Sequence, residues 1–428
     1  MTRWLLLLAA LLLAGCASTG PARQSLDAIA RDYVKLQLAI GEKEEGYIDA
    51  YYGPPEWQAE AKLKPQSLPE LAARAGVLAV RLRSLADARL QPIERRRRDF
   101  LLANLRAAST RLRMIGGEKL PFADEAEGLF GVRPQLRPLS AYDPVLARIE
   151  RLLPGTGALA DRVDAFQERY TIARDRLEPV MRSAIAECRR RTLAHIPLPA
   201  NERFTLEFVT GKSWGGYNWY KGDSNSVIQV NTDLPVRIGR AVDLGCHEGY
   251  PGHHVHNLLL EEKLAKGRGW VEFSLYPLYS PQSFIAEGSA NYGIELAFPG
   301  TEQLAFETAT LYPIAGLPTE AAGRYLALQE AMRDLAGARF TIAADYLDGR
   351  IDRARAVELI RKYQLVSPAR AEKSLAFIDQ YRSYVINYGL GLDHVRRAVE
   401  GSGASPAERW AAMARILSEP TLPSDLLR

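Results

Sequence analysis

The segment Cys246–Asn257, "CHEGYPGHHVHN", contains four of the six histidines of this 428-residue chain. His247 is followed directly by Glu248, as in the metal-binding pattern HExxH, but Pro251 stands where the second histidine is due. HExxH works on a helix because it places two imidazoles one turn apart, so that both nitrogens converge on one ion. The segment is therefore either a metal site with an altered spacing or a group of histidines in a loop.

Pro251 and Gly252 offer a physical way to restore the metal site. On an undistorted helix, six residues rotate a side chain by about 240°, and seven move it about 10.5 Å along the axis. Proline removes a backbone donor and clashes with the preceding turn, and glycine adopts backbone angles that other residues avoid. If these two residues bulge out, His253 takes the place of the missing ligand. We therefore expect His253 as the second ligand, with His254 as the alternative ligand and otherwise a group that faces the substrate or supports a ligand.

The third ligand is expected on a later helix, in the segment "FIAEGSANYGIEL". Glu287 is an acid among apolar residues, and such an acid needs a partner or a metal. Asn291, one turn later, could orient a ligating imidazole through a hydrogen bond. The alternative is that Glu287 is only an acid near the start of its helix, beside a capping Ser283.

Together these residues satisfy the requirements of zinc hydrolysis, which are three protein ligands, an open position and a base beside the attacking water. We expect His247, His253 and Glu287 to bind zinc and Glu248 to act as the base.

The regions around this segment predict a mainly α protein with one small sheet in mid-chain. Apolar residues recur at three and four positions through residues 25–200 and again through 235–428, which predicts two helical lobes, the second with the metal site. Between them, residues 201–234 contain short aromatic and β-branched runs separated by turn residues, which predicts two or three strands. The strand near 227–231 could pair with an extended peptide, and Gly215 and Gly216 could either let a substrate backbone approach or form a hairpin turn.

The first twenty residues, "MTRWLLLLAALLLAGCASTG", predict export. Residues 1–15 have the short basic start and apolar run of a signal peptide. Leu13-Ala14-Gly15-Cys16 resembles the bacterial lipobox, which implies cleavage before Cys16, a lipid on Cys16 and a tether over 16–24. Ala17 after the cysteine implies an outer-membrane lipoprotein that faces the periplasm. An ordinary cleaved signal and an uncleaved anchor remain the alternatives.

The remaining charged and sulfur-containing residues indicate no further chemistry. The formal net charge is +4, and the one basic run, "ERRRRDF" at Glu94–Phe100, is flanked by acids, which predicts a solvated helix face and no nucleic-acid partner. An oxidising compartment would permit a disulfide between Cys188 and Cys246, but two cysteines are too few for a disulfide framework, and Cys246 is expected to be a buried thiol. The isolated His195 and His394 are expected to be structural or solvated.

Three segments carry a resemblance to a known family: "HEGYPGHH", "EGSANYG" and "YIDAYYGPPEW" at Tyr47–Trp57. Together they resemble the bacterial domain-of-unknown-function 885 proteins, many of them lipoproteins, which are distantly similar to helical gluzincin metallopeptidases such as carboxypeptidase Taq and the oligopeptidases. The resemblance implies a large helical bundle with a deep cleft. It also implies His247 and His253 as zinc ligands, Glu248 as base and Glu287 as third ligand, although many members have Gln or Tyr where this chain has His256.

The predicted reaction also needs a hydrogen-bond donor for the oxyanion. Tyr384 and Tyr388 lie one turn apart in "YRSYVINYG", and resemblance to the helical gluzincins, which use a late tyrosine, favours Tyr388. The alternative is that both tyrosines only pack between helices. We predict a zinc-dependent hydrolase that cleaves peptides in the cell envelope. The alternative is a metal-binding or scaffold lipoprotein without activity, which would not need Glu248. A serine hydrolase is not supported, because the chain has no GxSxG motif.

Overall fold

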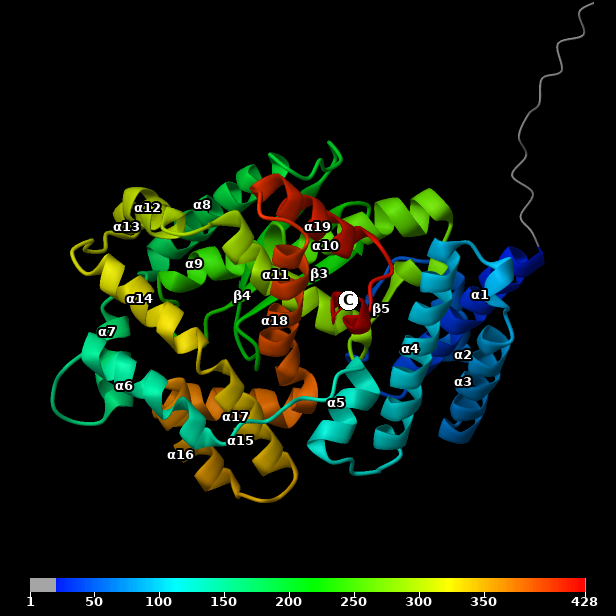
Figure 1. Ribbon diagram of the computed structural model, residues 1–428, viewed down its shortest axis with the longest axis horizontal. Coiled ribbons are helices and arrows are strands. Elements are labelled where there is room, and N and C mark those ends of the chain that lie inside the picture. The colour runs from blue at the N-terminus through cyan, green and yellow to red at the C-terminus, as the bar shows by residue number, and fades with distance from the viewer. Residues whose placement is uncertain (1–20, 428) are drawn as a thin grey trace, which may run out of the picture.

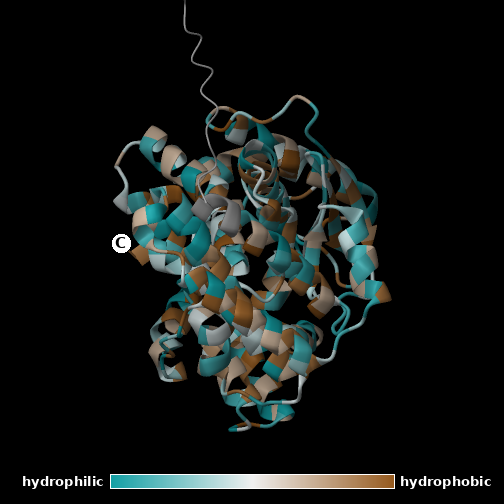
Figure 2. Cartoon of the chain, turned by 90° about the vertical axis from the view of Figure 1, so that its right-hand side faces the viewer, coloured by the Kyte–Doolittle hydropathy of each residue, from teal (hydrophilic) through white to brown (hydrophobic). Residues whose placement is uncertain are grey.

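Helices make up most of residues 21–427, the part of the chain that this computed structural model describes (Figure 1). The mainly α prediction is confirmed. Figure 2 shows hydrophilic and hydrophobic residues interspersed along the helices, as expected for helices that each bury one stripe. Among the described residues, no helix combines the length and apolar character needed to cross a bilayer. The predicted signal peptide and the predicted lipid site at Cys16 lie outside the described residues.

The first helices pack together at the right of Figure 1, where α1 lies against α3 and α4. The apolar positions Ile29, Tyr33, Leu36 and Ile40 recur at three and four residues along α1, and all four side chains are buried. The helices before the first large sheet are α1 (Pro21–Gly41), α2 (Pro55–Leu63), α3 (Leu68–Arg83), α4 (Pro92–Ile115), α5 (Phe122–Phe130), α6 (Asp143–Leu152), α7 (Leu159–Glu168) and α8 (Arg174–Leu193).

The sequence predicts a solvated helix face for the basic run in α4, but one residue of this run is buried. Arg97 is fully buried. Its Nη2 donates to Glu272 Oε2 at 2.9 Å, and its guanidinium lies 4.7 Å from the ring centre of Trp270. The prediction was wrong at this residue because its partner is 175 residues away, which no local pattern reveals.

The mid-chain sheet has the strand order β2-β4-β3. Its strands, β2 (Arg203–Val209), β3 (Gly216–Gly222) and β4 (Asn225–Asn231), lie within the predicted 201–234 region, so that prediction is confirmed. β3 and β4 form a hairpin whose turn residues, Asp223 and Ser224, both have positive φ, 52° and 56°, as in a type I′ turn. β4 is the central strand, and its backbone groups already pair with β2 and β3 on its two sides. The prediction that it pairs with a peptide was therefore wrong, because only the edge strands β2 and β3 have a free side.

A second sheet joins two distant short strands, β1 (Ile48–Tyr51) and β5 (Leu275–Pro277), which pair antiparallel. This sheet is not predicted by the sequence, because strands this short leave almost no periodicity. β1 brings the "YIDAYYG" segment next to the mid-chain sheet, since it also contacts β3.

The remaining helices surround the middle of the chain. α11 packs along α18 near the centre of Figure 1. They are α9 (Gly239–Leu244), α10 (His253–Leu260), α11 (Pro281–Ala297), α12 (Glu302–Phe306), α13 (Tyr312–Ala315), α14 (Ala322–Arg333), α15 (Ala336–Leu347), α16 (Arg353–Gln364), α17 (Pro368–Tyr381), α18 (Ile386–Gly401) and α19 (Pro406–Ser418). The 3-10 turns are η1 (Asp87–Arg89), η2 (Leu139–Tyr142), η5 (Val271–Ser274), η7 (Arg382–Val385) and η8 (Pro423–Leu427), and the π-helical turns are η3 (Gly245–Gly249), η4 (Glu261–Lys266) and η6 (Glu307–Leu311).

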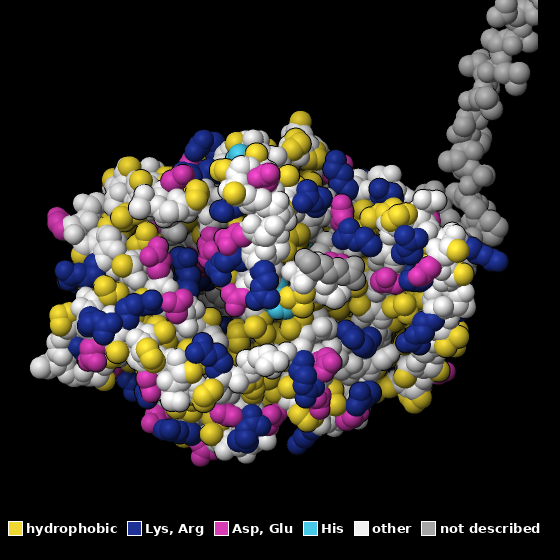
Figure 3. Space-filling model, viewed as in Figure 1, with side chains coloured by type: hydrophobic (Ala, Val, Ile, Leu, Met, Phe, Trp, Pro, Cys, Tyr) yellow, Lys and Arg dark blue, Asp and Glu magenta, His cyan; other side chains and the backbone are white. Residues whose placement is uncertain are grey.

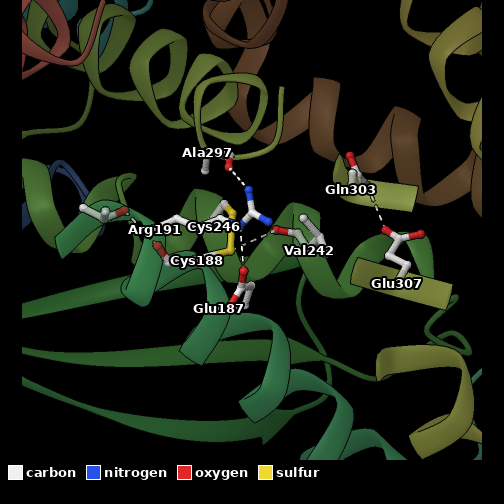
Figure 4. Close-up of a disulfide and its surroundings, with 9 residues drawn as sticks. Glu187, Cys188, Arg191, Val242, Cys246, Ala297, Gln303 and Glu307 are labelled. Atoms are coloured by element: carbon white, nitrogen blue, oxygen red, sulfur yellow. Dashed lines mark hydrogen bonds and ion pairs between the residues drawn. A yellow bond between two sulfur atoms is a disulfide. The ribbon is translucent and has the colours of Figure 1, made fainter. Parts of the chain in front are cut away.

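A disulfide between Cys188 of α8 and Cys246 of η3 links the two helical regions (Figure 4). The expectation that Cys246 is a free thiol was therefore wrong. The two Cα atoms lie 5.4 Å apart, within the range that a disulfide requires. Close by, Arg191 of α8 donates from Nη1 to the carbonyl oxygen of Ala297 at the end of α11, at 2.8 Å. These contacts tie α8 to the second helical region, and the division into two lobes stays a prediction.

Candidate functional site

The His-rich segment is a helix interrupted by a bulge. α9 runs into the π-helical turn η3, the chain leaves the helix at Tyr250 and Pro251, and α10 begins at His253. At Gly252, an added Cβ atom would lie 1.8 Å from the carbonyl oxygen of His247. Only glycine fits this approach, and the missing N–H of Pro251 prevents the helix from continuing. The bulge turns His253 back toward His247.

Three ligand-type side chains converge at this bulge. The Nε2 atoms of His247 and His253 lie 3.1 Å apart. Oε2 of Glu287, on α11, lies 3.1 Å from the His247 nitrogen and 3.7 Å from the His253 nitrogen. Their ligand atoms all lie within 4.8 Å of one another, which makes the cluster a possible metal site.

The spacing of these atoms fits a tetrahedral metal ion. Bonds of about 2.0–2.1 Å to nitrogen or oxygen place two ligand atoms roughly 3.3 Å apart, close to the separations found here. Oε2 of Glu287 is buried without a hydrogen-bond donor among the described residues. A buried oxygen of this kind requires a partner, and a cation between the three side chains would supply one.

Further hydrogen bonds hold the ligands in orientation. Oδ1 of Asn291 lies 3.1 Å from Nδ1 of His247, and the Asn291 amide donates to the backbone oxygen of Tyr388 at 3.0 Å. Because the amide oxygen only accepts, Nδ1 of His247 carries the proton and the lone pair of Nε2 faces the cluster. The hydroxyl of Tyr384 donates to Glu287 Oε1 at 2.8 Å, which leaves Oε2 for the cluster.

Electrostatics favour the ionised form of Glu287. Burial by itself raises the pKa of this carboxyl, but His253 and His247 beside it bring the pKa well below its usual range. For His247, burial lowers the pKa, but the neighbouring acids Glu287 and Glu248 together outweigh burial and raise it. The cluster therefore combines a carboxylate with two imidazoles.

Glu248 lies beside the cluster with its side chain buried. Burial raises the pKa of its carboxyl above the ordinary value, against the opposing effect of His247 and His253. A Cβ atom on Gly216 would lie 2.8 Å from Glu248 Oε1, so the absent side chain of Gly216 makes room for this carboxylate. Asn218 of β3 donates to the backbone oxygen of Glu248 at 2.7 Å, which fixes the sheet against the bulge.

Tyr384 and Tyr388 both line the cavity beside the cluster. Tyr384 belongs to the turn η7 and Tyr388 to the first turn of α18, with ring centres 6.0 Å apart. The Tyr388 ring also stacks on the imidazole of His247 at 6.2 Å. Burial raises the pKa of both hydroxyls well above the ordinary value, so both remain donors at neutral pH.

The other two histidines of the segment point elsewhere. His254 is fully buried, with Nδ1 2.8 Å from Ser226 Oγ and Nε2 3.4 Å from Glu202 Oε1. It faces the mid-chain sheet, because adjacent helical residues differ by about 100° in direction. The expectation that His254 faces the substrate was therefore wrong. His256 is also buried and lines none of the cavities near the cluster, and burial lowers its pKa to about 3.

The histidines outside the segment lie apart from the cluster. His195 stacks on Trp410 with ring centres 4.7 Å apart, and His394 packs edge-on against Phe284 at 5.2 Å. Both positions are structural, as the sequence predicts.

Two residues near the cluster, Asp49 and Tyr217, are not predicted as site residues by the sequence. Asp49 of β1 lines the same cavity, and the hydroxyl of Tyr217 on β3 donates to its Oδ1. Burial raises the pKa of Asp49 to about 6. The "YIDAYYG" segment contained this acid, but only the pairing of β1 with β5 places it here.

Three adjoining cavities form a cleft around these residues. The enclosed cavity, of about 50 Å³, is lined by the cluster, Glu248, both tyrosines and Asp49. The basic cavity, of about 430 Å³, shares His247, Glu248 and Tyr388 with it and adds the cations Arg240, Arg339, Arg370 and Lys373. An outer cavity of about 430 Å³ continues between α14, α15 and α18. Figure 3 shows the surface hollowed to the left of α18, with acidic and basic side chains around the hollow.

Comparisons with known proteins found similar solved structures, and two of them are described here. One, from Colwellia psychrerythraea, is described as a "putative lipoprotein"; it is 16% identical, with a TM-score of 0.49, and the match covers 92% of this chain and 75% of that one. The other is the M32 carboxypeptidase from Deinococcus radiodurans R1, 12% identical, with a TM-score of 0.43 and coverage of 94% and 93%. No protein-family model and no curated protein sequence matches. The resemblance to the domain-of-unknown-function 885 proteins therefore stands on the sequence motifs.

Proposed function

We propose that this protein is a zinc-dependent hydrolase that cleaves peptides. The observation that carries the proposal is the convergence of His247, His253 and Glu287 beside the buried carboxylate of Glu248, at the place where two cavities meet. Two imidazoles and one carboxylate are a common ligand set of catalytic zinc. A site that only stores a metal would not need an acid beside the first ligand.

The chain's own groups account for the proton transfers. Zinc, when bound, supplies a Lewis acid that makes water more acidic and polarises a carbonyl. Glu248 accepts the proton of the attacking water and delivers it to the leaving amine. Because burial raises the pKa of Glu248, this carboxylate is a stronger base than an exposed one.

Tyr388 is the better placed donor for the oxyanion. The hydroxyl of Tyr384 is already engaged with Glu287 Oε1. The structure gives the hydroxyl of Tyr388 no hydrogen-bond partner among residues 21–427, and its ring lies against His247. It can therefore donate to a substrate oxygen. Tyr384 then acts by orienting the ligand Glu287.

The place of action is proposed from the amino-terminal sequence. A lipid on Cys16 would hold the folded body on the membrane. Ala17 after this cysteine favours the outer membrane and the periplasmic side. Peptides of the cell envelope would then be the substrates.

The test replaces Glu248 by Gln, which is similar in shape but is no base. The purified variant should retain zinc, measured by elemental analysis, and lose about 10²- to 10⁴-fold in peptide hydrolysis. Glu320→Gln, at an exposed position that lines none of the three cavities, is the control and should keep full activity. Hydrolysis by Glu248→Gln at the level of the control would contradict the proposal. A zinc-loaded parent protein that cleaves no member of a peptide library would favour the metal-binding or scaffold alternative.

A further inference from the structure

Asp49 is an acid in the enclosed cavity that the proposed mechanism does not use. Its Oδ1 accepts from Tyr217, and among the described side chains no Lys or Arg forms an ion pair with it. An acid at such a place requires a cation or a donor. Tyr217 supplies a donor, and no lysine or arginine among the described residues lines the cavity, so a charge partner for Asp49 would come from a ligand.

Arg339 is the corresponding cation outside the enclosed cavity. It lines the basic cavity, its Nε is buried without an acceptor, and no carboxylate among the described residues pairs with it. Its guanidinium packs on the ring of Phe377 at 5.0 Å. Phe377 lines both the enclosed and the basic cavity, so Arg339 lies close to their junction.

The other cations of the basic cavity already have partners. Arg240 pairs with Asp243, Lys373 pairs with Asp233 at 2.9 Å, and Arg370 donates to the carbonyl oxygen of Pro235 at 2.9 Å. Among the described cations that line this cavity, Arg339 is therefore the one without a carboxylate partner, since Arg370 also lies 3.6 Å from Glu168 Oε1.

The volumes set the direction in which a peptide can enter. The enclosed cavity, with about 50 Å³, holds roughly four water-sized groups. An amino group and a small side chain fit into this space. The basic cavity is far larger, at about 430 Å³, and opens into the outer cavity.

We propose that the cleft takes short peptides amino end first, with the α-ammonium paired with Asp49 and a carboxylate paired with Arg339. This inference rests on the proposed function and deepens it: the protein is an exopeptidase that removes one small amino-terminal residue. The carboxylate is either the carboxyl terminus of a di- or tripeptide or the side chain of an acidic residue after the scissile bond.

The test uses zinc-loaded Glu248→Gln protein, which binds peptides without cleaving them, and titration calorimetry. The probes are Ala-Ala-Ala, its N-acetyl form, its carboxyl amide, and Ala-Glu-Ala amide. Hydrogen bonds to charged groups are worth about 1.5–3 kcal/mol, so acetylation and amidation should each weaken binding on the order of 10- to 100-fold. If Ala-Glu-Ala amide recovers the affinity, the carboxylate comes from a side chain; if it does not, it comes from the terminus.

Two further substitutions, each made in the Glu248→Gln protein, test which side chain binds the ammonium and which binds the carboxylate of the peptide. With Asp49→Asn, which can still accept from Tyr217, the penalty for acetylation should disappear. With Arg339→Gln, the penalty for amidation should disappear. The exposed Asp175→Asn and Arg324→Gln, which line none of the cavities, should leave both penalties intact. Equal binding of free and blocked peptides, or penalties that persist in the two cavity variants, would overturn the inference.

Hydrolysis by the zinc-loaded parent protein separates the two proposals. Charge-dependent binding without any hydrolysis would reject the hydrolase and keep the peptide site. Hydrolysis of acetylated and amidated peptides as fast as of the free peptide would keep the hydrolase and reject the site.

Discussion

Gly252 lies so close to His247 that a Cβ atom on the glycine would stand 1.8 Å from the histidine carbonyl oxygen. This approach lets a sequence spacing of six residues bring the two imidazole nitrogens within 3.1 Å of each other. The close approach at Gly252 takes the place of the regular helical turn that separates the two histidines of HExxH.

Gly252→Ala should therefore separate the start of α10 from η3. We expect a loss of about 1–3 kcal/mol in the free energy of unfolding, as for other overpacked sites, together with weaker zinc binding. Gly76→Ala in α3 is the control, because a Cβ atom there meets no atom within 4 Å; it should stabilise by about 0.5–1 kcal/mol. Chemical denaturation and zinc titration measure both effects, and unchanged zinc affinity in Gly252→Ala would show that the bulge is not needed.

The two neighbouring histidines should separate cleanly in metal content. His253→Ala removes a nitrogen from the cluster, so the purified protein should lose zinc. His254→Ala should keep zinc and lose stability, because Ser226 and Glu202 lose a buried partner. The reverse pattern in elemental analysis would assign the metal to His254.

Asn291→Ala should weaken metal binding without removing a ligand. The amide orients His247 through a 3.1 Å hydrogen bond, and loss of such a supporting group lowers metal affinity by about 10- to 100-fold. Competition with a zinc chelator measures this. Asn201→Ala, at an exposed position, should bind zinc like the parent protein.

The disulfide should contribute substantially to stability. It closes a segment of 58 residues, for which the chain-entropy relation gives about 4 kcal/mol. The double variant Cys188→Ala, Cys246→Ala should unfold at lower denaturant concentration than the oxidised parent protein. A reductant should lower the unfolding midpoint of the parent protein to about that of the variant and leave the midpoint of the variant unchanged. If a reductant has no effect on the midpoint of the parent protein, the disulfide does not form.

The free energy of unfolding should fall in acid because the carboxyl of Glu202 has a lower pKa in the folded state than in the unfolded state. Burial opposes the ionisation of this carboxyl, but His254, Arg189 and Tyr250 together lower its pKa to about 2. The pKa of a glutamate in the unfolded chain is about 4.3, so the folded state is favoured above that pH. As the pH falls from about 4.3 to about 2, the unfolded state takes up the proton first and this contribution is lost.

Glu202→Gln should accordingly lower the free energy of unfolding by about 1–3 kcal/mol at pH 7. The difference from the parent protein should shrink as the pH falls through that window. Denaturation curves at several pH values measure it, and a difference that does not change with pH would mean that the charge of Glu202 is not responsible.

The sequence alone was sufficient for the features that depend on near neighbours. The helical regions and the mid-chain strands follow from periodicity, because one buried stripe per element is a local property. The position of the bulge follows from Pro251 and Gly252, whose backbone limits hold in any fold. Glu287 could be singled out because an acid within an apolar helix is unusual wherever that helix packs.

Only the tertiary structure decided the features that depend on what lies across the fold. Asp49 reaches the cleft because β1 pairs with a strand more than 200 residues later, and Arg97 is buried because Glu272 meets it. Cys246 is bonded to Cys188 and β4 lies between two other strands for the same reason. Local periodicity records which face of an element is buried, whereas the partner on that face is chosen by packing across the whole chain.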